Sequence, residues 1–300
     1  MKIIVWFSVL MMVFFGYSCT SGKGDGIRYI FFLIGDGMGN GQVTGTQFYR
    51  AELDGRIGLD SLSFTGFPVV NMMSTYSAFN AITCSAAAGT ALATGTRTSN
   101  GTIGKDAIHS KDVYSIAVKA KEKGLSVSID HATPAVFYAH QSSRSMYYEI
   151  AMDAVKTGFD LYAGSGFLQT RSMTDSTAPD VYRSFEDAGY TIARGYDDFN
   201  RKREKATKMV FVQETGASPF SLPYAIDRKP GDLTLSEITR GAIDYLFQKS
   251  NKGFFLMVEG GKIDWACHSN DGATMVNEVM DFSDAVEVVL EFYHQHPDET

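Results

Sequence analysis

Three short apolar runs, each followed closely by polar residues, constrain the fold of this chain more than any other feature. The runs are Arg28–Ile34, Leu125–Ile129 and Phe254–Val258. Continuous apolar runs of this length are typical of strands buried on both faces of a parallel sheet, and we expect the first to be a central strand. Helical patterns that begin near Ser110 and, with a capping box, at Thr234 precede the other two runs. The alternation predicts an α/β fold with a mostly parallel central sheet flanked by helices.

The polar residues that close these runs predict where a ligand binds. Asp36 follows the first run, His131 and Thr133 follow the second, and Glu259 follows the third. In open parallel sheets, ligands bind beyond the carboxyl ends of the strands. We therefore expect these four side chains to lie at one edge of the sheet, although they are far apart in the sequence.

The remaining patterns are weaker. Residues 165–232 contain one short strand pattern at Met209–Val212 and a charged run at Arg201–Lys205, which suits a solvated helix face or a loop. We expect this section to be covering structure without a catalytic role. A last amphipathic helix ends before Pro297. Its apolar positions are Val276, Val279, Phe282, Val286, Val289 and Tyr293.

Length and charge limit the class of protein. The 300 residues suit one large α/β domain or two small ones. The net charge of −7 gives no indication of a nucleic-acid surface. A phosphate site would therefore need local cations or metal ions.

The N-terminus has the pattern of an exported protein. One lysine precedes an apolar run that ends at Phe15 and is shorter than the ~20 residues of a membrane span, so residues 1–19 are predicted to be a signal peptide. Gly16–Cys19 is similar to a bacterial lipoprotein cleavage box, and the alternative is an ordinary signal with an incidental cysteine. Residues 20–26 form a polar tether. We expect an exported bacterial protein, periplasmic or anchored to the membrane through a lipid on Cys19.

The segment Thr83–Ala91 places one serine before a run of small residues. Small residues let the backbone approach a ligand closely, and an alanine-rich run readily starts a helix. The hydroxyl of Ser85 would then lie beside unpaired N–H groups and the positive end of the helix dipole, where a nucleophile can meet an anion. The alternative is that Ser85 only caps a packed helix.

A metal site is indicated close to the third run. Asp264 and His268 are four residues apart, so on a helix they project from the same face and can ligate one zinc ion. An isolated pair at this spacing is more often an ion pair on a solvated helix. Glu259, five residues before Asp264, favours the metal site.

Together these segments resemble the alkaline phosphatase family, phosphomonoesterases of α/β fold with two zinc ions and one magnesium ion. The similar segments occur in the family's order and cover most of residues 28–290. They are Ile34–Gly39, Thr83–Ala87 with Ala93–Gly95, His131–Ala135, Ala139–Arg144, and Val258–Gly260 with Ile263, Asp264 and His268.

The resemblance implies a role for each matching residue. Ser85 would be the nucleophile that becomes phosphorylated, and Arg144 would grip two phosphate oxygens. Asp36 would bridge one zinc ion and the magnesium ion. The implied substrates are small phosphate monoesters, and a homodimer is possible. The remaining implied ligands are Thr133 and Glu259 for magnesium, and Asp264 and His268 for the second zinc ion.

Three residues depart from the usual family pattern. Cys84 replaces an aspartate that would orient Arg144, and His131 stands where bacterial members often carry an aspartate. Trp265 replaces a lysine or histidine that would help to hold product phosphate. We expect Cys84, His131 and Trp265 to lie beside the ligating groups, and phosphate to be released readily.

The length of the chain is a fourth departure. The family's other zinc ligands, an Asp-His pair and a later histidine, would lie beyond Thr300. Residues 27–300 then correspond to the N-terminal part of an alkaline phosphatase domain, without its C-terminal strands and with an unpaired sheet edge. We expect a complete set of magnesium ligands, incomplete zinc sites and weak activity for this chain.

Other functions compete with this hypothesis. A sulfatase needs a proline and an arginine shortly after its nucleophile, and the residues after Ser85 include neither. Phosphodiesterase relatives usually use threonine and lack a counterpart of Arg144, so the monoester hypothesis is favoured. A non-catalytic lipoprotein that binds phosphate or metal, or an inactive fragment, remains an alternative. We expect Cys84 and Cys267 to be free thiols.

Overall fold

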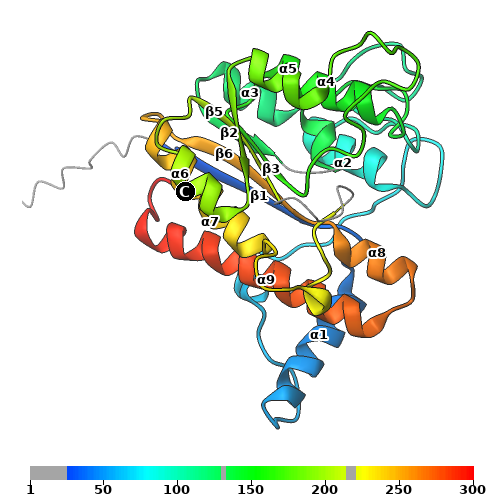
Figure 1. Cartoon of the computed structure of the whole chain (residues 1–300). Coiled ribbons are helices and arrows are strands. Elements are labelled where there is room, and N and C mark those ends of the chain that lie inside the picture. Colours follow the sequence, from blue (N-terminus) through cyan, green and yellow to red (C-terminus); the bar gives the residue numbers. More distant parts are fainter. Residues whose placement is uncertain (1–25, 130–132, 214–220) are drawn as a thin grey trace, which may run out of the picture.

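Six parallel strands form one sheet in the part of the chain that the structure describes. The computed structural model describes residues 26–129, 133–213 and 221–300. The strands lie in the order β1-β6-β2-β3-β5-β4, and every neighbouring pair is parallel (Figure 1). This confirms the predicted sheet. The strands are β1 (Tyr29–Gly35), β2 (Ser126–Ile129), β3 (Leu161–Gly164), β4 (Tyr190–Arg194), β5 (Lys208–Val212) and β6 (Phe254–Gly260).

Helices cover both faces of the sheet. Figure 1 shows α3, α4 and α5 on one face and α7 and α9 on the other, with α8 beyond the end of β6. The α-helices are α1 (Asn40–Leu53), α2 (Ser85–Thr94), α3 (Ile116–Glu122), α4 (Tyr147–Thr157), α5 (Val181–Asp187), α6 (Tyr196–Lys202), α7 (Leu235–Lys249), α8 (Lys262–His268) and α9 (Gly272–Gln295). The 3-10 helices are η1 (Ser63–Gly66), η2 (Pro134–Phe137) and η3 (Ala225–Asp227).

β1 lies at an edge of this sheet, so the prediction of a central position was wrong. Within the described residues it pairs only with β6. Phe31 and Leu33 pack against one apolar cluster, and Ile30 and Phe32 pack against the other, so both faces are covered while the side chains stay partly exposed. An apolar run indicates that both faces of a strand are covered by other parts of the protein. It does not indicate whether the strand pairs with one neighbouring strand or with two.

The section 165–232 contributes strands to the sheet, which corrects its interpretation as covering structure. β5 matches the predicted strand at Met209–Val212, and β4 pairs with it along five residues to form the second edge. β4 was missed because its sequence, YTIAR, alternates only weakly and is half-buried. The charged run Arg201–Lys205 spans the end of α6 and the turn after it, as predicted.

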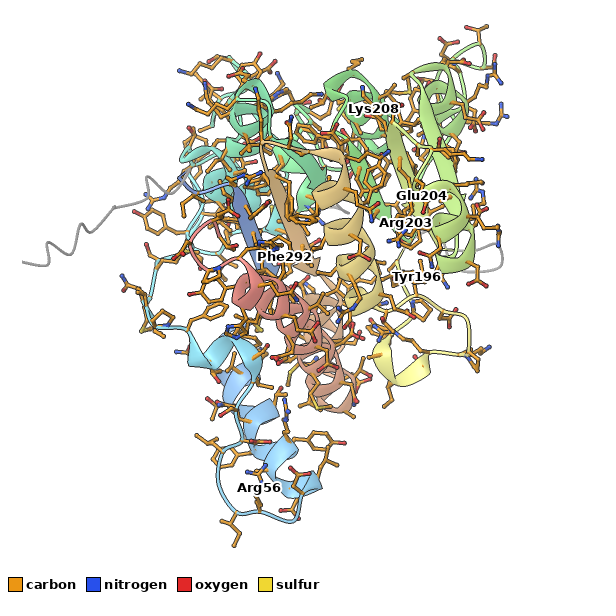
Figure 2. The ribbon with its side chains drawn as sticks, turned by 90° about the vertical axis from the view of Figure 1, so that its left-hand side faces the viewer. Arg56, Tyr196, Arg203, Glu204, Lys208 and Phe292 are labelled. Atoms are coloured by element: carbon orange, nitrogen blue, oxygen red, sulfur yellow. The ribbon has the colours of Figure 1, made fainter. Side chains whose placement is uncertain are left out.

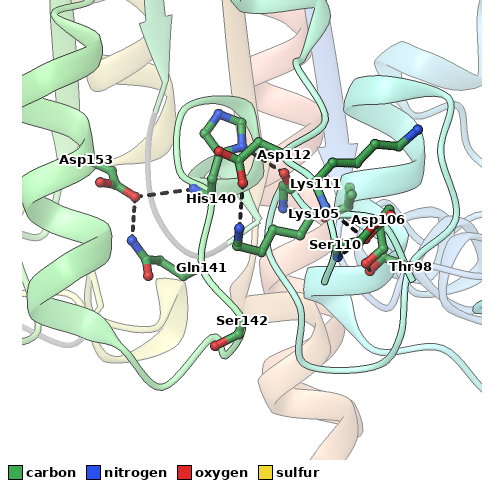
Figure 3. A network of polar contacts seen from close by, with 12 residues as sticks. Thr98, Lys105, Asp106, Ser110, Lys111, Asp112, His140, Gln141, Ser142 and Asp153 are labelled. Atoms are coloured by element: carbon green, nitrogen blue, oxygen red, sulfur yellow. Dashed lines mark hydrogen bonds and ion pairs between the residues drawn. The ribbon is translucent and has the colours of Figure 1, made fainter. Parts of the chain in front are cut away.

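α3 begins later than the predicted start near Ser110. Its first residue is Ile116, and its N-cap is Ser115, whose hydroxyl accepts a hydrogen bond from the N–H of Val118. Ser110 lies in the preceding loop, where its backbone and hydroxyl both donate to the carboxylate of Asp106 (Figure 3). Serine and aspartate favour such local turns over helix interiors, which explains the later start.

The two C-terminal helices agree with their predicted signals. Thr234 and Glu237 form the capping box at the start of α7. α9 ends at Gln295, two residues before Pro297, and buries most of its predicted apolar positions, while Tyr293 remains exposed. Figure 2 shows Phe292 of α9 in the packed body of the molecule, whereas Arg56 lies at the far tip beyond α1.

The predicted targeting elements lie outside the described residues. They include the signal peptide with Cys19 and all but the last residue of the tether. In the described part of the chain, no helix is both long enough and apolar enough to cross a membrane.

Candidate active site

Ser85 lies at the first position of α2 and its hydroxyl faces a carboxylate. Cys84 is the N-cap residue, and Ser85 Oγ donates a hydrogen bond of 2.8 Å to Asp36 Oδ2. The alternative that Ser85 is the helix cap is therefore wrong. The first four N–H groups of a helix have no partner within it, so Ser85 lies at a positive helix end.

Asp36 follows β1 directly and is positioned by the sheet. Its backbone N–H donates to the carbonyl oxygen of Gly260, the last residue of β6. Burial raises the pKa of Asp36 above its ordinary value, and the nearby carboxylate of Asp264 raises it further. The hydrogen bond from Ser85 and the charge of Arg144 act in the opposite direction. A partly buried carboxylate beside a second one favours a cation at this position.

Glu259 and Thr133 reach the same edge of the sheet. Glu259 pairs in register with Ile34, so it lies across from the end of β1. Thr133 precedes η2 and is buried, and its hydroxyl has no hydrogen-bond partner in the described part of the chain. Buried hydroxyls are almost always bonded, so this oxygen is available to a ligand. His131 lies outside the described residues.

Asp264 and His268 project from one face of α8, as their spacing predicts. Asp264 Oδ2 lies 3.4 Å from His268 Nε2, and the histidine side chain is 79% exposed. Asp264 also lies directly against Gly37, where a Cβ would come within 2.9 Å of the Asp264 backbone. Asp36 and Asp264 are thus held close together by a glycine that has a positive φ of 67°.

Arg144 is connected to the start of α2 through the backbone of one residue, Gly101. The N–H of Arg144 donates to the carbonyl of Gly101 at 2.6 Å, and the N–H of Gly101 donates to Cys84 Sγ at 3.1 Å. Cys84 therefore lies between Ser85 and the backbone that holds Arg144. Its sulfur contacts the backbone that supports Arg144, in place of a carboxylate that would contact the guanidinium.

The segment before Arg144 is fixed by a group that sequence reasoning missed. Asp153 on α4 accepts hydrogen bonds from the His140 N–H at 3.3 Å and from Gln141 Nε2 at 2.6 Å (Figure 3). His140 Nδ1 lies 2.7 Å from the carbonyl oxygen of Gly104. Because these contacts come from distant positions, no local sequence signal indicates them.

A second cation, also missed, lies close to Trp265. Lys262 Nζ donates to Ser221 Oγ at 3.0 Å and lies 3.4 Å from the ring centre of Tyr224 and 5.0 Å from that of Trp265. Burial lowers the pKa of Lys262. The carboxylates of Glu278 and Asp227 raise it and so partly offset this shift. Trp265 is 39% exposed and covers one side of the site.

Some of these residues line one cavity of about 200 Å³. Asp36, Arg144, Glu259 and Lys262 line it together with Trp265. Its other walls are mostly apolar. The arrangement places two carboxylates and an arginine around a space that admits a small anionic molecule, and Ser85 is hydrogen-bonded to one of these carboxylates, Asp36.

The oxygen set of Asp36, Thr133 and Glu259 fits magnesium. Carboxylate and hydroxyl oxygens are the ligands that this ion prefers, and the unbonded Thr133 hydroxyl supplies one of them. Asp264 and His268 offer an oxygen and a nitrogen that suit zinc. In the residues that the structure describes, no three histidine, cysteine, aspartate or glutamate side chains form a group that could hold a metal ion.

Gly89 allows α2 to approach Thr133. A Cβ at Gly89 would lie 2.8 Å from Thr133 Cγ2 and 3.2 Å from Val136 Cγ2. Alanine usually stabilises a helix interior by about 1 kcal/mol relative to glycine, but overpacking costs about 1–3 kcal/mol. We expect Gly89→Ala to lower the free energy of unfolding in urea titrations. The control Gly45→Ala, on α1 with nothing within 4 Å, should raise it, and equal gains in both variants would contradict the close packing.

Solved alkaline phosphatases have the same fold. The structure of the enzyme from the Antarctic bacterium TAB5 superposes with a TM-score of 0.79 and 29% sequence identity, covering 91% of this chain and 77% of that one. The alkaline phosphatase of Thermus thermophilus gives a TM-score of 0.80 with 27% identity, covering 92% of this chain and 58% of that one. The fold therefore defines a phosphatase-like α/β domain.

The sequence comparisons identify the family. The family model for alkaline phosphatase matches residues 27–164 and 198–300, and the chain belongs to the alkaline phosphatase family. Alkaline phosphatase 4 of Bacillus subtilis is 35% identical over 283 residues, and alkaline phosphatase 3 of the same organism is 31% identical over 285. The alignments cover 89% and 90% of this chain but only 58% and 59% of these relatives.

Proposed function

We propose that this chain carries the nucleophile and phosphate grip of a metal-dependent phosphate monoesterase, with a phosphoserine intermediate at Ser85. The observation that carries the proposal is the 2.8 Å hydrogen bond from Ser85 Oγ to Asp36 at the start of α2. Family membership supports the same reaction class.

Each polar group of the site has a separate task in this proposal. Ser85 Oγ attacks the phosphorus atom and takes up the phosphoryl group while the alcohol leaves, and water then cleaves the phosphoserine to give inorganic phosphate and the free serine. Asp36 orients the hydroxyl through their hydrogen bond. Arg144, whose planar guanidinium matches two non-bridging oxygens, holds the phosphate. The unpaired N–H groups at the start of α2 favour the negative charge that Ser85 acquires.

Metal ions would complete this chemistry. Asp36, Thr133 and Glu259 would hold magnesium, while Asp264 and His268 would contribute to a zinc site and Asp36 to a second one. When bound, the ions would lower the pKa of the serine hydroxyl and balance the charge of the transferring group. A related solved structure, a variant of the TAB5 enzyme that is 28% identical, has magnesium bound in its M3 site.

Comparing two esters of nitrophenol tests the reaction class. We expect the monoester, whose phosphate has free oxygens for Arg144, to be hydrolysed in preference to the bis-ester. Faster turnover of the bis-ester would favour the alternative, a phosphodiesterase of the same superfamily. Absence of turnover together with tight phosphate binding would favour a non-catalytic binding protein.

Replacing Thr133 with valine separates magnesium binding from folding. The buried hydroxyl without a partner costs about 1–3 kcal/mol, so Thr133→Val is expected to raise the melting temperature of the metal-free protein. The same variant should lose most of the stabilisation that added magnesium gives. Thermal unfolding with and without magnesium measures both effects.

Thr90 offers the matched control. It is also buried, but its hydroxyl donates to the carbonyl of Ala86 at 2.8 Å. Thr90→Val should lower the melting temperature and leave the shift caused by magnesium unchanged. An unaltered magnesium shift in Thr133→Val would remove this residue from the proposed ligands.

Export to the periplasm or to a membrane surface is also proposed. It is supported by the apolar N-terminal run and the cleavage pattern that ends at Cys19.

The two cysteines of the described residues, Cys84 and Cys267, are free, which agrees with the expectation.

A further inference from the structure

Arg144 lies in a loop that Asp153 closes. The loop joins η2 to the start of α4 at Tyr147. Asp153 of α4 reaches back to the start of this loop, where its Oδ2 accepts hydrogen bonds from the His140 N–H and from the side chain of Gln141 (Figure 3). The Asp153 side chain is only 14% exposed, so these hydrogen bonds are largely shielded from water.

Residues 101–104, which we call the bridge segment, lie against the same loop. The backbone groups of Ile103 and Gln141 bond each other in both directions, with N···O distances of 3.0 and 2.9 Å. The carbonyl oxygen of Gly101 accepts the N–H of Arg144 at 2.6 Å. The loop is therefore attached to the bridge segment at two points, one of them at Arg144 itself.

The bridge segment is also bonded to α2, the helix that begins with Ser85. At one end, the N–H of Gly101 donates to Cys84 Sγ at 3.1 Å. At the other end, the N–H of Gly104 donates to the hydroxyl of Thr90 at 3.2 Å. The bridge segment thus connects the helix of the nucleophile with the loop of the phosphate grip and sets the distance between them.

The carboxylate of Asp153 is well suited to hold the loop in this position. It accepts hydrogen bonds with a charged group, and such bonds are stronger than those between neutral groups. A guanidinium that bonds two phosphate oxygens at once depends on its exact position. A displacement of about 1 Å, caused by a substitution away from the reacting atoms, can cost on the order of a hundredfold in rate.

We propose that Asp153 is a positioning residue for Arg144. It holds the start of the loop against the bridge segment, which keeps the guanidinium at the distance from Ser85 that a bound phosphate requires. Asp153 does not line the cavity of the site, so its effect passes through the loop. The proposal rests on the proposed function, since it takes Arg144 as the residue that holds phosphate.

A double-variant cycle tests the proposal by the binding of inorganic phosphate. Calorimetric titration with magnesium and zinc present would compare the unaltered chain, Asp153→Ala, Arg144→Ala and the double variant. Asp153→Ala should weaken phosphate binding on the order of tenfold. The double variant should bind phosphate no more weakly than Arg144→Ala, because no guanidinium remains to be positioned.

The possible outcomes separate this inference from the proposed function. Unchanged affinity in Asp153→Ala would overturn the positioning role. An equal further loss when Asp153→Ala is added to Arg144→Ala would also overturn it, since a merely structural residue acts in both backgrounds. Full affinity in Arg144→Ala, or no phosphate binding by the unaltered chain, would contradict the phosphate grip and the positioning role together.

Three further variants show that the contacts with the loop carry the effect. Asp153→Asn keeps an oxygen that can accept both hydrogen bonds and should restore most of the affinity. Gln141→Ala removes the 2.6 Å contact from the side of the loop and should weaken phosphate binding in the same direction, even if Asp153→Ala fails to fold.

Lys156→Ala is the matched control. Lys156 contacts the other oxygen of the same carboxylate, Asp153 Oδ1, at 3.0 Å, and its side chain is 72% exposed. This exposed ion pair does not reach the loop, so the affinity for phosphate should stay unchanged. A loss as large as that in Asp153→Ala would contradict the proposal.

Discussion

Ser85→Ala is expected to reduce hydrolysis of a nitrophenyl phosphate monoester by on the order of a thousandfold or more, because it removes the attacking oxygen. The helix α2 itself should persist, since its N-cap is Cys84 and alanine is favourable at the start of a helix. The effect is therefore expected in turnover, with little change in the melting temperature. Steady-state kinetics and thermal unfolding measure the two quantities.

A trapping experiment shows whether the loss has the proposed cause. Protein quenched in acid after incubation with labelled phosphate should carry the label on the peptide that contains Ser85. Ser142→Ala, which removes an exposed serine two residues before Arg144, should retain both label and turnover. Label of equal intensity in Ser85→Ala would rule out this serine as the phosphorylated residue.

Asp281→Asn is expected to produce the largest loss of stability. Asp281 on α9 forms a paired, two-hydrogen-bond contact with Arg228, and the two side chains are only 10% and 16% exposed. Burial opposes the charge of Arg228, but the hydrogen bonds and charge of Asp281 outweigh it and raise the pKa of the guanidinium. Removing one partner of such a pair costs about 3–5 kcal/mol, because it leaves a buried charge. Urea unfolding measures the loss.

The same pair allows a stricter test by combining substitutions. The double variant Arg228→Met with Asp281→Leu should be far more stable than the sum of the single losses predicts, because no charge is left alone. Glu291→Gln is the control, because it breaks an ion pair with Arg240 in which both side chains are 49% exposed. It should change the free energy of unfolding by less than about 1 kcal/mol. Additive losses at the buried pair would contradict the coupling.

The sequence predicted the edge at which the site forms because that prediction needs only strand direction. Asp36 and Glu259 follow apolar runs, and parallel strands bring the ends of such runs together wherever they lie in the chain. Asp264 and His268 were likewise predictable, since helix geometry alone places them on one face. Their roles as ligands stay predictions.

The hydrogen bonds that hold the site residues in place could not be predicted in the same way. Asp153 reaches His140 across the gap between α4 and a loop, and Gly101 connects Cys84 to Arg144 through its peptide groups. Such contacts depend on tertiary positions that no local pattern encodes. The edge position of β1 was missed for a related reason, since a strand's number of neighbours is decided by the whole sheet.

The pairing of β1 with β6 has a consequence for synthesis. Tyr29 pairs with Phe254, so the first strand waits for its partner while about 220 further residues are made. At about 5–20 residues per second, that interval is on the order of ten to forty seconds. During this interval the apolar strand β1 lacks its neighbour β6, and the exposed strand favours binding by a chaperone. The sheet cannot be completed until most of the chain has left the ribosome.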